Sequence, residues 1–285
     1  MMADSDDDQV GIPLIEDLDE SPPAAARKSS KRKRDGAEEE DAADKKAAKK
    51  KKRTKRKPQD VEDEALDSEL GVNHAIAHMD SRLMADHIAQ RTRRFQPNLS
   101  LVEAEDIHIS EKAIMDTTSF DQQRINDNLP TFLEKFAPSR TKKKGAKLSD
   151  ASKEPGSPHT LVVAGAGLRA ADLTRALRKF QTKQSMVAKL FAKHIKLKEA
   201  AEMTKKTRMG IGVGTPQRLI DLLENGALSA KNLERIVVDA SHIDQKKRGI
   251  LDMKELQVPL VQLLNKAELK ERFGSGEGKI ELIFY

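Results

Sequence analysis

The chain has 285 residues, of which 34% are charged and only 3% aromatic, and its net charge is +6 at pH 7. A chain this polar cannot bury enough apolar surface along its whole length, so we expect a modest folded core beside a disordered part. It contains no cysteine, which excludes disulfide bridges, zinc–thiolate sites and thiol nucleophiles. Its acidic first residues do not form the apolar stretch of a signal peptide, and no segment has the roughly 18–20 apolar residues of a membrane span.

Residues 1–70 are expected to form a disordered tail with strongly separated charges. The first 26 residues contain eight acids and no base, whereas residues 27–57 contain sixteen bases and six acids, a net charge of +10. Two dense basic clusters of this kind are typical of nuclear or nucleolar import signals. The alternative is a solvated charge run that only keeps the tail extended. The predicted import residues are Lys31, Arg32, Lys33, Arg34, Lys49, Lys50, Lys51, Lys52, Arg53, Lys55, Arg56 and Lys57.

Residues 71–138 are expected to form an arm of short helices. One helix is predicted up to Pro97, with a single apolar face and three arginines in its last turn, where the helix dipole favours cations. The predicted face consists of Ile76, Met79, Leu83, Met84, His87 and Ile88, and the arginines are Arg91, Arg93 and Arg94. A second helix is predicted before Pro138, with Phe132, Leu133 and Phe136 on one face.

Residues 139–158 are polar and rich in Gly, Pro and Ser, which predicts a linker. From residue 159 to residue 285, apolar strand patterns alternate with helical ones. This alternation predicts an α/β fold with a mostly parallel sheet that is covered on both faces. The predicted strands are 160–164, 209–215, 235–239 and 279–285, and helices are predicted around Leu173–Phe180 and over 186–198, 218–225 and 258–264.

The motif GAGLRA, Gly165–Ala170, follows a predicted strand and precedes a predicted helix. It fits the G-x-G-x-x-G/A pattern in which glycines let the backbone approach a dinucleotide pyrophosphate. Such a site also needs an acidic residue about twenty positions later, at the end of the next strand. That region is rich in lysine here, which favours the alternative of a tight strand-to-helix turn.

The motif GTPQRL, Gly214–Leu219, also joins a predicted strand to a helix. Thr215 can cap the helix and Pro216 suits its first turn. The exposed N–H groups of that helix end, with Arg218 one turn further on, could hold a phosphate. The alternative is a structural turn that is simply well capped.

The third motif is IVVDASHID, Ile236–Asp244, which places a carboxylate at the end of a buried strand. A ligand for a metal–nucleotide complex belongs at this position of an α/β sheet. Asp239, His242 and Asp244 could therefore hold a metal ion, but no second motif completes such a site. The alternative is a polar strand end in which Ser241 acts as a cap.

The order and spacing of these pieces resemble the first RecA-like domain of DEAD-box RNA helicases, over about residues 158–285. LVVAGAGLRAADLTRALRKF resembles the region of the A-P-T-R-E-L-A motif, and GTPQRL resembles T-P-G-R-L. VVDASHID stands where V-L-D-E-A-D would be, and KIELIFY resembles the strand that leads to S-A-T. The resemblance implies the fold of that domain and, for Thr215 and Arg218, contact with an RNA backbone.

The departures from the helicase pattern concern its chemistry. Phosphoryl transfer needs a G-x-x-x-x-G-K-[ST] loop, and the sequence contains none. Ala240 replaces the glutamate of D-E-A-D, Gly167 replaces the RNA-contacting arginine of A-P-T-R-E-L-A, and neither S-A-T nor a second RecA-like domain follows. We therefore expect an incomplete RecA-like domain that is not an enzyme and uses no cofactor or metal.

The chain as a whole resembles one family more closely still, the Cms-type subunits of the small-subunit processome. The carrying segments are MADHIAQRTRRF, LPTFLEKFAP, AGLRAADLTRALRKF, GIGVGTPQRLIDLL and RIVVDASHIDQKKRGILDMKE. This resemblance implies a non-catalytic nucleolar factor of the early 90S pre-ribosome. That particle contains the box C/D guide particle that directs 18S ribosomal RNA maturation.

The expected function is binding of pre-ribosomal RNA and processome proteins, including the box C/D snoRNP, in the nucleus and nucleolus. The predicted RNA-binding residues are Thr215, Arg218, Lys246, Lys247, Arg248, Arg91, Arg93 and Arg94. Contacts to phosphate imply an affinity that falls steeply with salt. Two alternatives remain: a scaffold that binds only proteins, and an enzyme that depends on a nucleotide.

Overall fold

A computed structural model describes residues 65–136, 148–191, 195–274 and 278–285. They all belong to one of the two compact units of the chain, Thr54–Tyr285. Both predicted import clusters, nearly all of the predicted tail and residues 139–147 of the predicted linker lie outside the described residues. Among the described residues, no helix is both long and apolar enough to cross a membrane.

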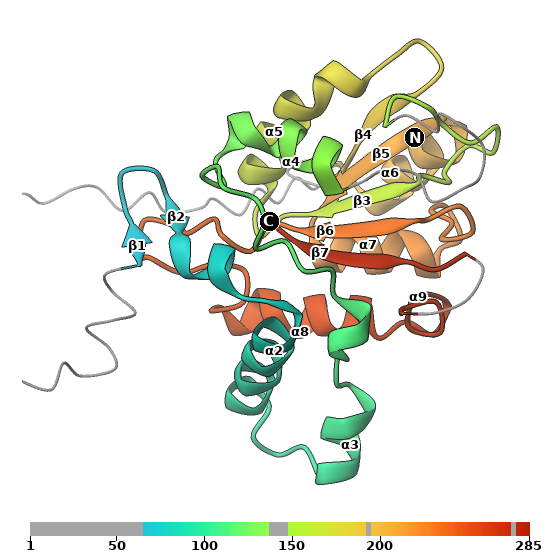
Figure 1. The fold of residues 1–285 in the computed structure, drawn as a ribbon. Coiled ribbons are helices and arrows are strands. Elements are labelled where there is room, and N and C mark those ends of the chain that lie inside the picture. Colours follow the sequence, from blue (N-terminus) through green and yellow to red (C-terminus); the bar gives the residue numbers. More distant parts are fainter. Residues whose placement is uncertain (1–64, 137–147, 192–194, 275–277) are drawn as a thin grey trace, which may run out of the picture. The chain divides into compact units, whose positions relative to one another are not determined.

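Five parallel strands form the central sheet, in the order β4-β5-β3-β6-β7 (Figure 1). All four strands predicted from the sequence are present, which confirms the α/β fold with a parallel sheet. The bounds are β3 Thr160–Val163, β4 Met186–Leu190, β5 Met209–Gly214, β6 Arg235–Val238 and β7 Glu281–Phe284. A separate antiparallel hairpin consists of β1, Leu66–Asp67, and β2, Val72–Asn73.

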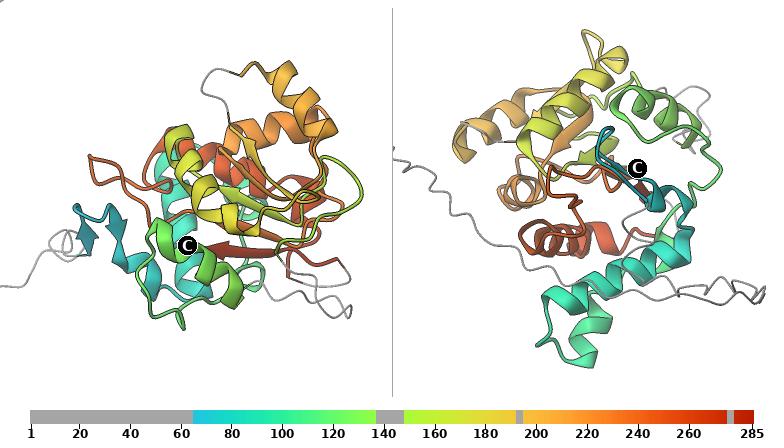
Figure 2. Two further views of the ribbon diagram at one scale, coloured as in Figure 1. Left: turned by 90° about the horizontal axis from the view of Figure 1, so that it is seen from above. Right: turned by 90° about the vertical axis from the view of Figure 1, so that its left-hand side faces the viewer.

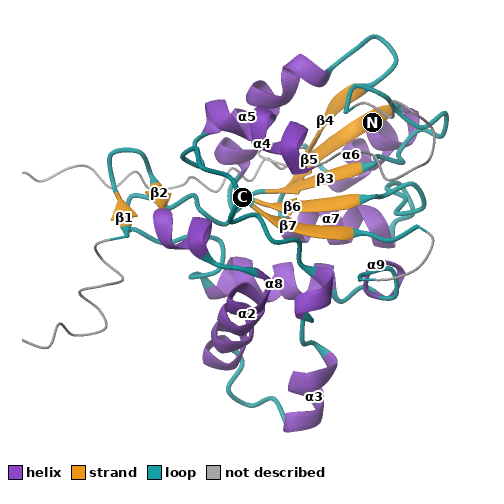
Figure 3. Cartoon of the chain, viewed as in Figure 1, coloured by secondary structure: helices purple, strands orange, loops and turns teal. Residues whose placement is uncertain are grey.

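Helices cover both faces of the sheet, because alternate side chains of each buried strand point to opposite sides (Figures 1 and 3). Leu161 and Val163 of β3 belong to one apolar cluster, whereas Val162 belongs to the other. The first cluster includes residues of five helices: α2 (Ser81–Phe95), α6 (Leu197–Lys206), α7 (Pro216–Glu224), α8 (Lys254–Leu264) and α9 (Ala267–Lys270). The second cluster includes residues of α4 (Leu129–Phe136), α5 (Gly167–Ala176) and the 3₁₀ turn η4 (Leu177–Phe180).

The predicted helical arm consists of separate short elements that pack on this core. Asp80 caps α2 by accepting a bond from the Leu83 N–H at 2.8 Å, so the predicted long helix divides into the 3₁₀ turn η1, His74–His78, and α2. Met84 and Ile88 are buried as predicted, but Leu83 is 54% exposed and does not belong to the apolar face. The remaining elements are α3, Leu101–Asp106, and the turns η2, Glu111–Ala113, and η3, Asn126–Asn128. Figure 2 shows α2 and α3 on the α8 side of the sheet.

The helix predicted over residues 186–198 is wrong. Met186–Leu190 is strand β4, which pairs in parallel with β5, and the next helix, α6, begins only at Leu197. The apolar residues of this segment fit a helical spacing as well as a strand, because Val187 and Leu190 lie three positions apart. Pairing with β5 decides the outcome, and it leaves Lys189 exposed while Val187 and Leu190 are buried.

The two edges of the sheet differ. Along β7, the chain just after η2 runs beside the strand. Ile114 makes an isolated parallel bridge with Leu282, and the Met115 N–H donates to the Leu282 carbonyl at 2.8 Å. Arg124 then donates to the Phe284 carbonyl at 2.8 Å. The β7 edge is thus covered by the chain itself. Strand β4 forms the opposite edge, and among the described residues it pairs only with β5.

Residues 148–158 make specific contacts with the amino-terminal edge of the sheet. Gly156 has a positive φ of 70°, its N–H donates to the Thr207 carbonyl and its carbonyl accepts from the Ser229 N–H. A Cβ atom at Gly156 would lie 2.4 Å from the Ala227 carbonyl oxygen, so only glycine fits there. Leu148 and Ser157 are buried. This part of the predicted linker is therefore anchored to the core.

Candidate nucleic-acid interface

The three sequence motifs meet at the carboxyl-terminal edge of the sheet, because all five strands run in the same direction (Figure 1). GAGLRA follows β3, GTPQRL follows β5 and DASHID follows β6. Ligands of parallel α/β sheets bind at this edge. The side chains present there decide what this edge can do.

A buried ion pair occupies the middle of the edge. The Arg169 Nε atom lies 2.7 Å from Asp239 Oδ2, and its Nη2 atom lies 2.9 Å from Asp239 Oδ1. Burial alone would lower the pKa of Arg169, but the hydrogen bonds and the charge of Asp239 outweigh this effect and raise it. Arg169 Nη1 also donates to the Asn126 side chain. Both carboxylate oxygens of Asp239 are therefore engaged by one guanidinium group.

The other polar residues of DASHID do not assemble around a metal. Asp244 pairs with Arg248, and among the described residues no group of three or more His, Asp or Glu side chains could hold a metal ion. His242 is partly buried, and burial, followed by the charge of Arg169, lowers its pKa. Ser241 is fully buried and its Oγ atom makes no hydrogen bond among the described residues, so the alternative in which Ser241 caps the strand end is wrong.

GTPQRL forms the turn into α7. Thr215 is the N-cap residue, but its side chain makes no capping bond, while Pro216 takes the first helical position as predicted. The Arg218 Nη2 atom donates to the Ile195 carbonyl at 3.3 Å, and Nη1 is buried without a partner among the described residues. Arg218 is thus directed toward the segment that precedes α6, and Thr215 is half-buried.

A basic turn projects from the loop after β6. The Asp244 Oδ1 atom accepts from the N–H groups of Lys246 and Arg248, at 2.8 and 2.9 Å, and Lys247 takes a left-handed conformation with a φ of 58°. Arg248 forms an ion pair with Asp244 at 2.8 Å. The side chains of Lys246, Lys247 and Arg248 are exposed, because the turn is organised by its backbone and by Asp244.

Of the three arginines of α2, one forms an internal ion pair and two are exposed to solvent. Arg91 Nη2 lies 2.9 Å from Asp252 Oδ1, which ties α2 to the loop that carries the basic turn. The Gln257 amide of α8 donates to Thr92 Oγ1 at 2.7 Å, which ties α2 to α8 as well. Arg93 and Arg94 are exposed. The structure therefore connects α2 with Lys246–Arg248, whereas Thr215 and Arg218 lie at β5, with β3 between them and β6.

Comparison with known proteins decides the family. A model of the CMS1 family, described as "U3-containing 90S pre-ribosomal complex subunit", matches residues 25–285. The chain belongs to this family. Membership connects it with the 90S pre-ribosomal complex and with ribosome biogenesis.

Curated relatives support the assignment to the CMS1 family. Protein CMS1 of Chaetomium thermophilum is 58% identical over 230 residues, which cover 81% of this chain and 90% of that protein. Protein cms1 of Schizosaccharomyces pombe is 31% identical, over 71% of this chain and 69% of the relative. Human Protein CMSS1 is 27% identical, over 64% of this chain and 59% of the relative.

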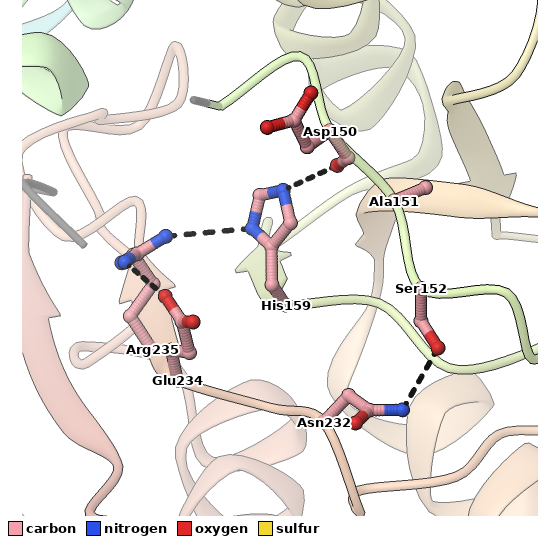
Figure 4. Close-up of a pocket in the computed structure, with 7 residues that line it drawn as sticks. All are labelled: Asp150, Ala151, Ser152, His159, Asn232, Glu234 and Arg235. Carbon is pink, nitrogen blue, oxygen red and sulfur yellow. Dashed lines mark hydrogen bonds and ion pairs between the residues drawn. The ribbon is translucent and has the colours of Figure 1, made fainter. Parts of the chain in front are cut away.

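This member of the CMS1 family also has a polar pocket at the opposite, amino-terminal edge of the sheet (Figure 4). It has a volume of about 260 Å³ and surrounds His159, which precedes β3. His159 Nε2 bonds to the Asp150 carbonyl at 3.0 Å, and Nδ1 lies 2.7 Å from Thr160 Oγ1. Burial, and next the charge of Arg235, lower the pKa of His159 to about 4. The pocket therefore contains a neutral histidine at pH 7.

We expect the free energy of unfolding to fall by about 2–3 kcal/mol on acidification because of His159. In the unfolded chain the imidazole takes up a proton below about pH 6.5, whereas in the folded protein it does so only near pH 4. The loss should therefore develop as the pH falls from about 6.5 to 4. Urea titrations of wild type and His159→Gln across this range measure it. The variant should show a smaller loss, and exposed His108→Gln should behave as wild type.

Proposed function

We propose that this chain is a non-catalytic assembly factor of the early 90S pre-ribosome that contacts pre-ribosomal RNA during 18S ribosomal RNA maturation. One observation carries the RNA-binding part: the Arg91–Asp252 ion pair joins α2, with exposed Arg93 and Arg94, to the loop that presents Lys246 and Lys247. Exposed lysine and arginine side chains on two connected elements suit a phosphate backbone. Thr215 and Arg218 form a second, separate candidate contact.

The pairing of Asp239 with Arg169 supports a function without catalysis. In a nucleotide-hydrolysing relative of this fold, a carboxylate at this position would help to hold a metal–nucleotide complex. Here both oxygens of Asp239 are bonded to Arg169. Together with Ala240 and the missing phosphate-binding loop sequence, this pairing supports a RecA-like domain that has lost its chemistry.

The basic tail supports delivery to the nucleus and nucleolus. Residues 27–57 carry a net charge of +10, which suits both an import signal in the clusters 31–34 and 49–57 and nonspecific affinity for RNA. Processome proteins and the box C/D snoRNP are the proposed neighbours in the particle.

Neutralising the basic surface should weaken RNA binding and its salt dependence. We expect the full chain with Arg93→Gln, Arg94→Gln, Lys246→Gln and Lys247→Gln to bind a pre-ribosomal RNA fragment at least about tenfold more weakly. Each lost phosphate contact releases one counterion fewer, so the slope of log K against log salt should fall by about 1 per contact. Fluorescence titrations between about 50 and 200 mM salt measure both quantities.

The matched control is Lys153→Gln with Lys183→Gln, because both lysines are exposed and lie toward the amino-terminal edge of the sheet. It should be compared with the pair Lys246→Gln and Lys247→Gln, which removes the same charge. Equal losses in the two pairs would mean that only net charge matters, and they would refute a localised RNA-binding surface.

A scaffold that binds only proteins is the second candidate. It is favoured by the engagement of Arg91 and Arg218 in internal contacts, and by Leu101 and Val102 on α3, which are 89% and 71% exposed. If the fourfold variant loses RNA affinity in solution but still sediments with pre-ribosomes in cells, the scaffold explains the association better. Loss of both properties supports RNA contact.

A further inference from the structure

The open edge of the sheet has a groove that the proposed RNA contacts do not use. Strand β4, Met186–Leu190, is the last strand on its side, and among the described residues only β5 pairs with it (Figure 1). In a parallel strand, alternate residues direct their N–H and C=O groups to opposite neighbours. Half of the backbone groups of β4 therefore face away from β5, toward this groove.

The groove lies between the two helical layers. Its volume is about 390 Å³, with α5 and η4 contributing Thr174 and Arg178 on one side and α6 contributing Met203 on the other. Met186 and Met203 are 38% and 58% exposed. Unbranched methionine side chains adapt to different apolar partners, which makes them common on peptide-binding surfaces. An added strand would thus find backbone partners along β4 and apolar contacts from α6.

The two edges of the sheet differ in how the chain itself covers them. The β7 edge is covered by residues 114–117 and by Arg124. Strand β4 pairs with β5 on its inner side, with one register shift between Met186 and Val187, and no described residue pairs with its outer side. Uncovered edge strands invite pairing with another chain, so an edge that no described residue covers, in a sheet whose other edge is covered, is a candidate interface.

The charge of the residues that line the groove indicates what kind of segment binds there. Arg178 and Lys189 line the groove, and none of the described residues that line it is acidic. The acids of α6, Glu199 and Glu202, are exposed but do not belong to the lining. A second copy of β4 would bring two further cations, its own Lys189 and Arg178, to the same edge, and like charges close together are unfavourable. An acidic segment would meet complementary charge instead.

We propose that the β4 edge binds an extended acidic segment of a partner protein, which adds to the sheet as a sixth parallel or antiparallel strand. Its backbone pairs with β4, its alternate apolar side chains contact Met186 and Met203, and its carboxylates face Arg178 and Lys189. Strand addition of this kind takes affinity from main-chain bonds and specificity from alternate side chains. The partner differs in chemistry and position from the RNA proposed for the basic turn.

The test uses the full chain and a fluorescent peptide of sequence DVELDIEV, with KVKLKIKV as its basic counterpart. We expect the acidic peptide to bind at least about tenfold more tightly than the basic one, and to slow amide hydrogen exchange in β4. An acidic peptide that is N-methylated at alternate residues lacks the N–H donors along one of its edges. If the blocked edge is the one that would face β4, this peptide should not bind. Arg178→Glu with Lys189→Glu should reverse the preference, so that the basic peptide binds more tightly.

The reversal keeps the test independent of folding, because a misfolded variant would bind neither peptide selectively. Lys153→Glu with Lys254→Glu changes the same charge at exposed positions outside the groove and should keep the original preference. No binding of the acidic peptide at millimolar concentration, binding without protection of β4, or an unchanged preference in the reversed variant would each overturn the proposal. A concentration-dependent dimer that protects β4 would overturn it in favour of a second copy.

Discussion

Replacing Arg124 with methionine should lower the free energy of unfolding by about 3 kcal/mol or more. Arg124 is only 1% exposed, and burial lowers its pKa to about 10. Its Nη1 donates to the Phe284 carbonyl at 2.8 Å, and its Nη2 donates to Thr117 Oγ1 at 2.9 Å. Methionine fills much of the space, but Thr117 Oγ1 loses its donor, and the Phe284 carbonyl keeps only the longer bond from Thr117 Oγ1, at 3.4 Å. The cost should therefore come from lost hydrogen bonds rather than from a cavity.

Urea unfolding followed by circular dichroism measures this effect. Arg124→Lys keeps the charge but loses the forked geometry that reaches both Phe284 and Thr117, so we expect an intermediate loss. Exposed Arg93→Met is the matched control and should change the stability by less than about 0.5 kcal/mol. A loss below about 1 kcal/mol for Arg124→Met would show that the bonds to the end of β7 contribute little to the fold.

Breaking the ion pair at the carboxyl-terminal edge should have a similar or larger effect. In Arg169→Met, the buried carboxylate of Asp239 loses both of its hydrogen-bond donors, so we expect a loss of about 3–5 kcal/mol. Arg169→Met combined with Asp239→Leu also removes the unpaired carboxylate, and this double variant should be more stable than Arg169→Met alone. Unfolding titrations of both single variants and the double variant complete the cycle.

The double variant also tests the absence of catalysis. If it folds and restores 18S ribosomal RNA maturation in cells that lack the wild-type protein, Asp239 has a structural role only. A folded double variant that fails to restore maturation, while still sedimenting with pre-ribosomes, would point instead to chemistry at this carboxylate. Such a result would contradict the proposed non-catalytic function.

The sequence was sufficient to predict the parallel sheet, because its buried strands are short apolar runs separated by helical patterns. Thr160–Val163 and Arg235–Val238 are examples, with every residue buried. An edge strand carries a weaker signal, since one side of it stays in contact with water. For this reason Met186–Leu190, with exposed Lys189, was predicted as a helix although it is β4.

The candidate site was predictable only where local sequence determines it. The exposed turn at Lys246 and Lys247 follows from its charged, polar sequence, and Pro216 marks the start of α7. By contrast, Arg169 meets Asp239 across 70 residues and Arg124 meets Phe284 across 160, and no local pattern specifies such pairs. One available signal was that a carboxylate at the end of a buried strand requires a cationic partner from a neighbouring element.

The covering of β7 by earlier residues also affects how the protein is made. Arg124 precedes its partner Phe284 by 160 residues. At a translation rate of roughly 5–20 residues per second, that partner leaves the ribosome about 8–32 s later. During this interval, the Phe132 ring lacks its contact with Tyr285, which directly follows β7 and whose ring centroid lies 4.7 Å away. The newly made chain should therefore depend on chaperones most strongly before β7 emerges, and its folding should finish only after synthesis of that strand.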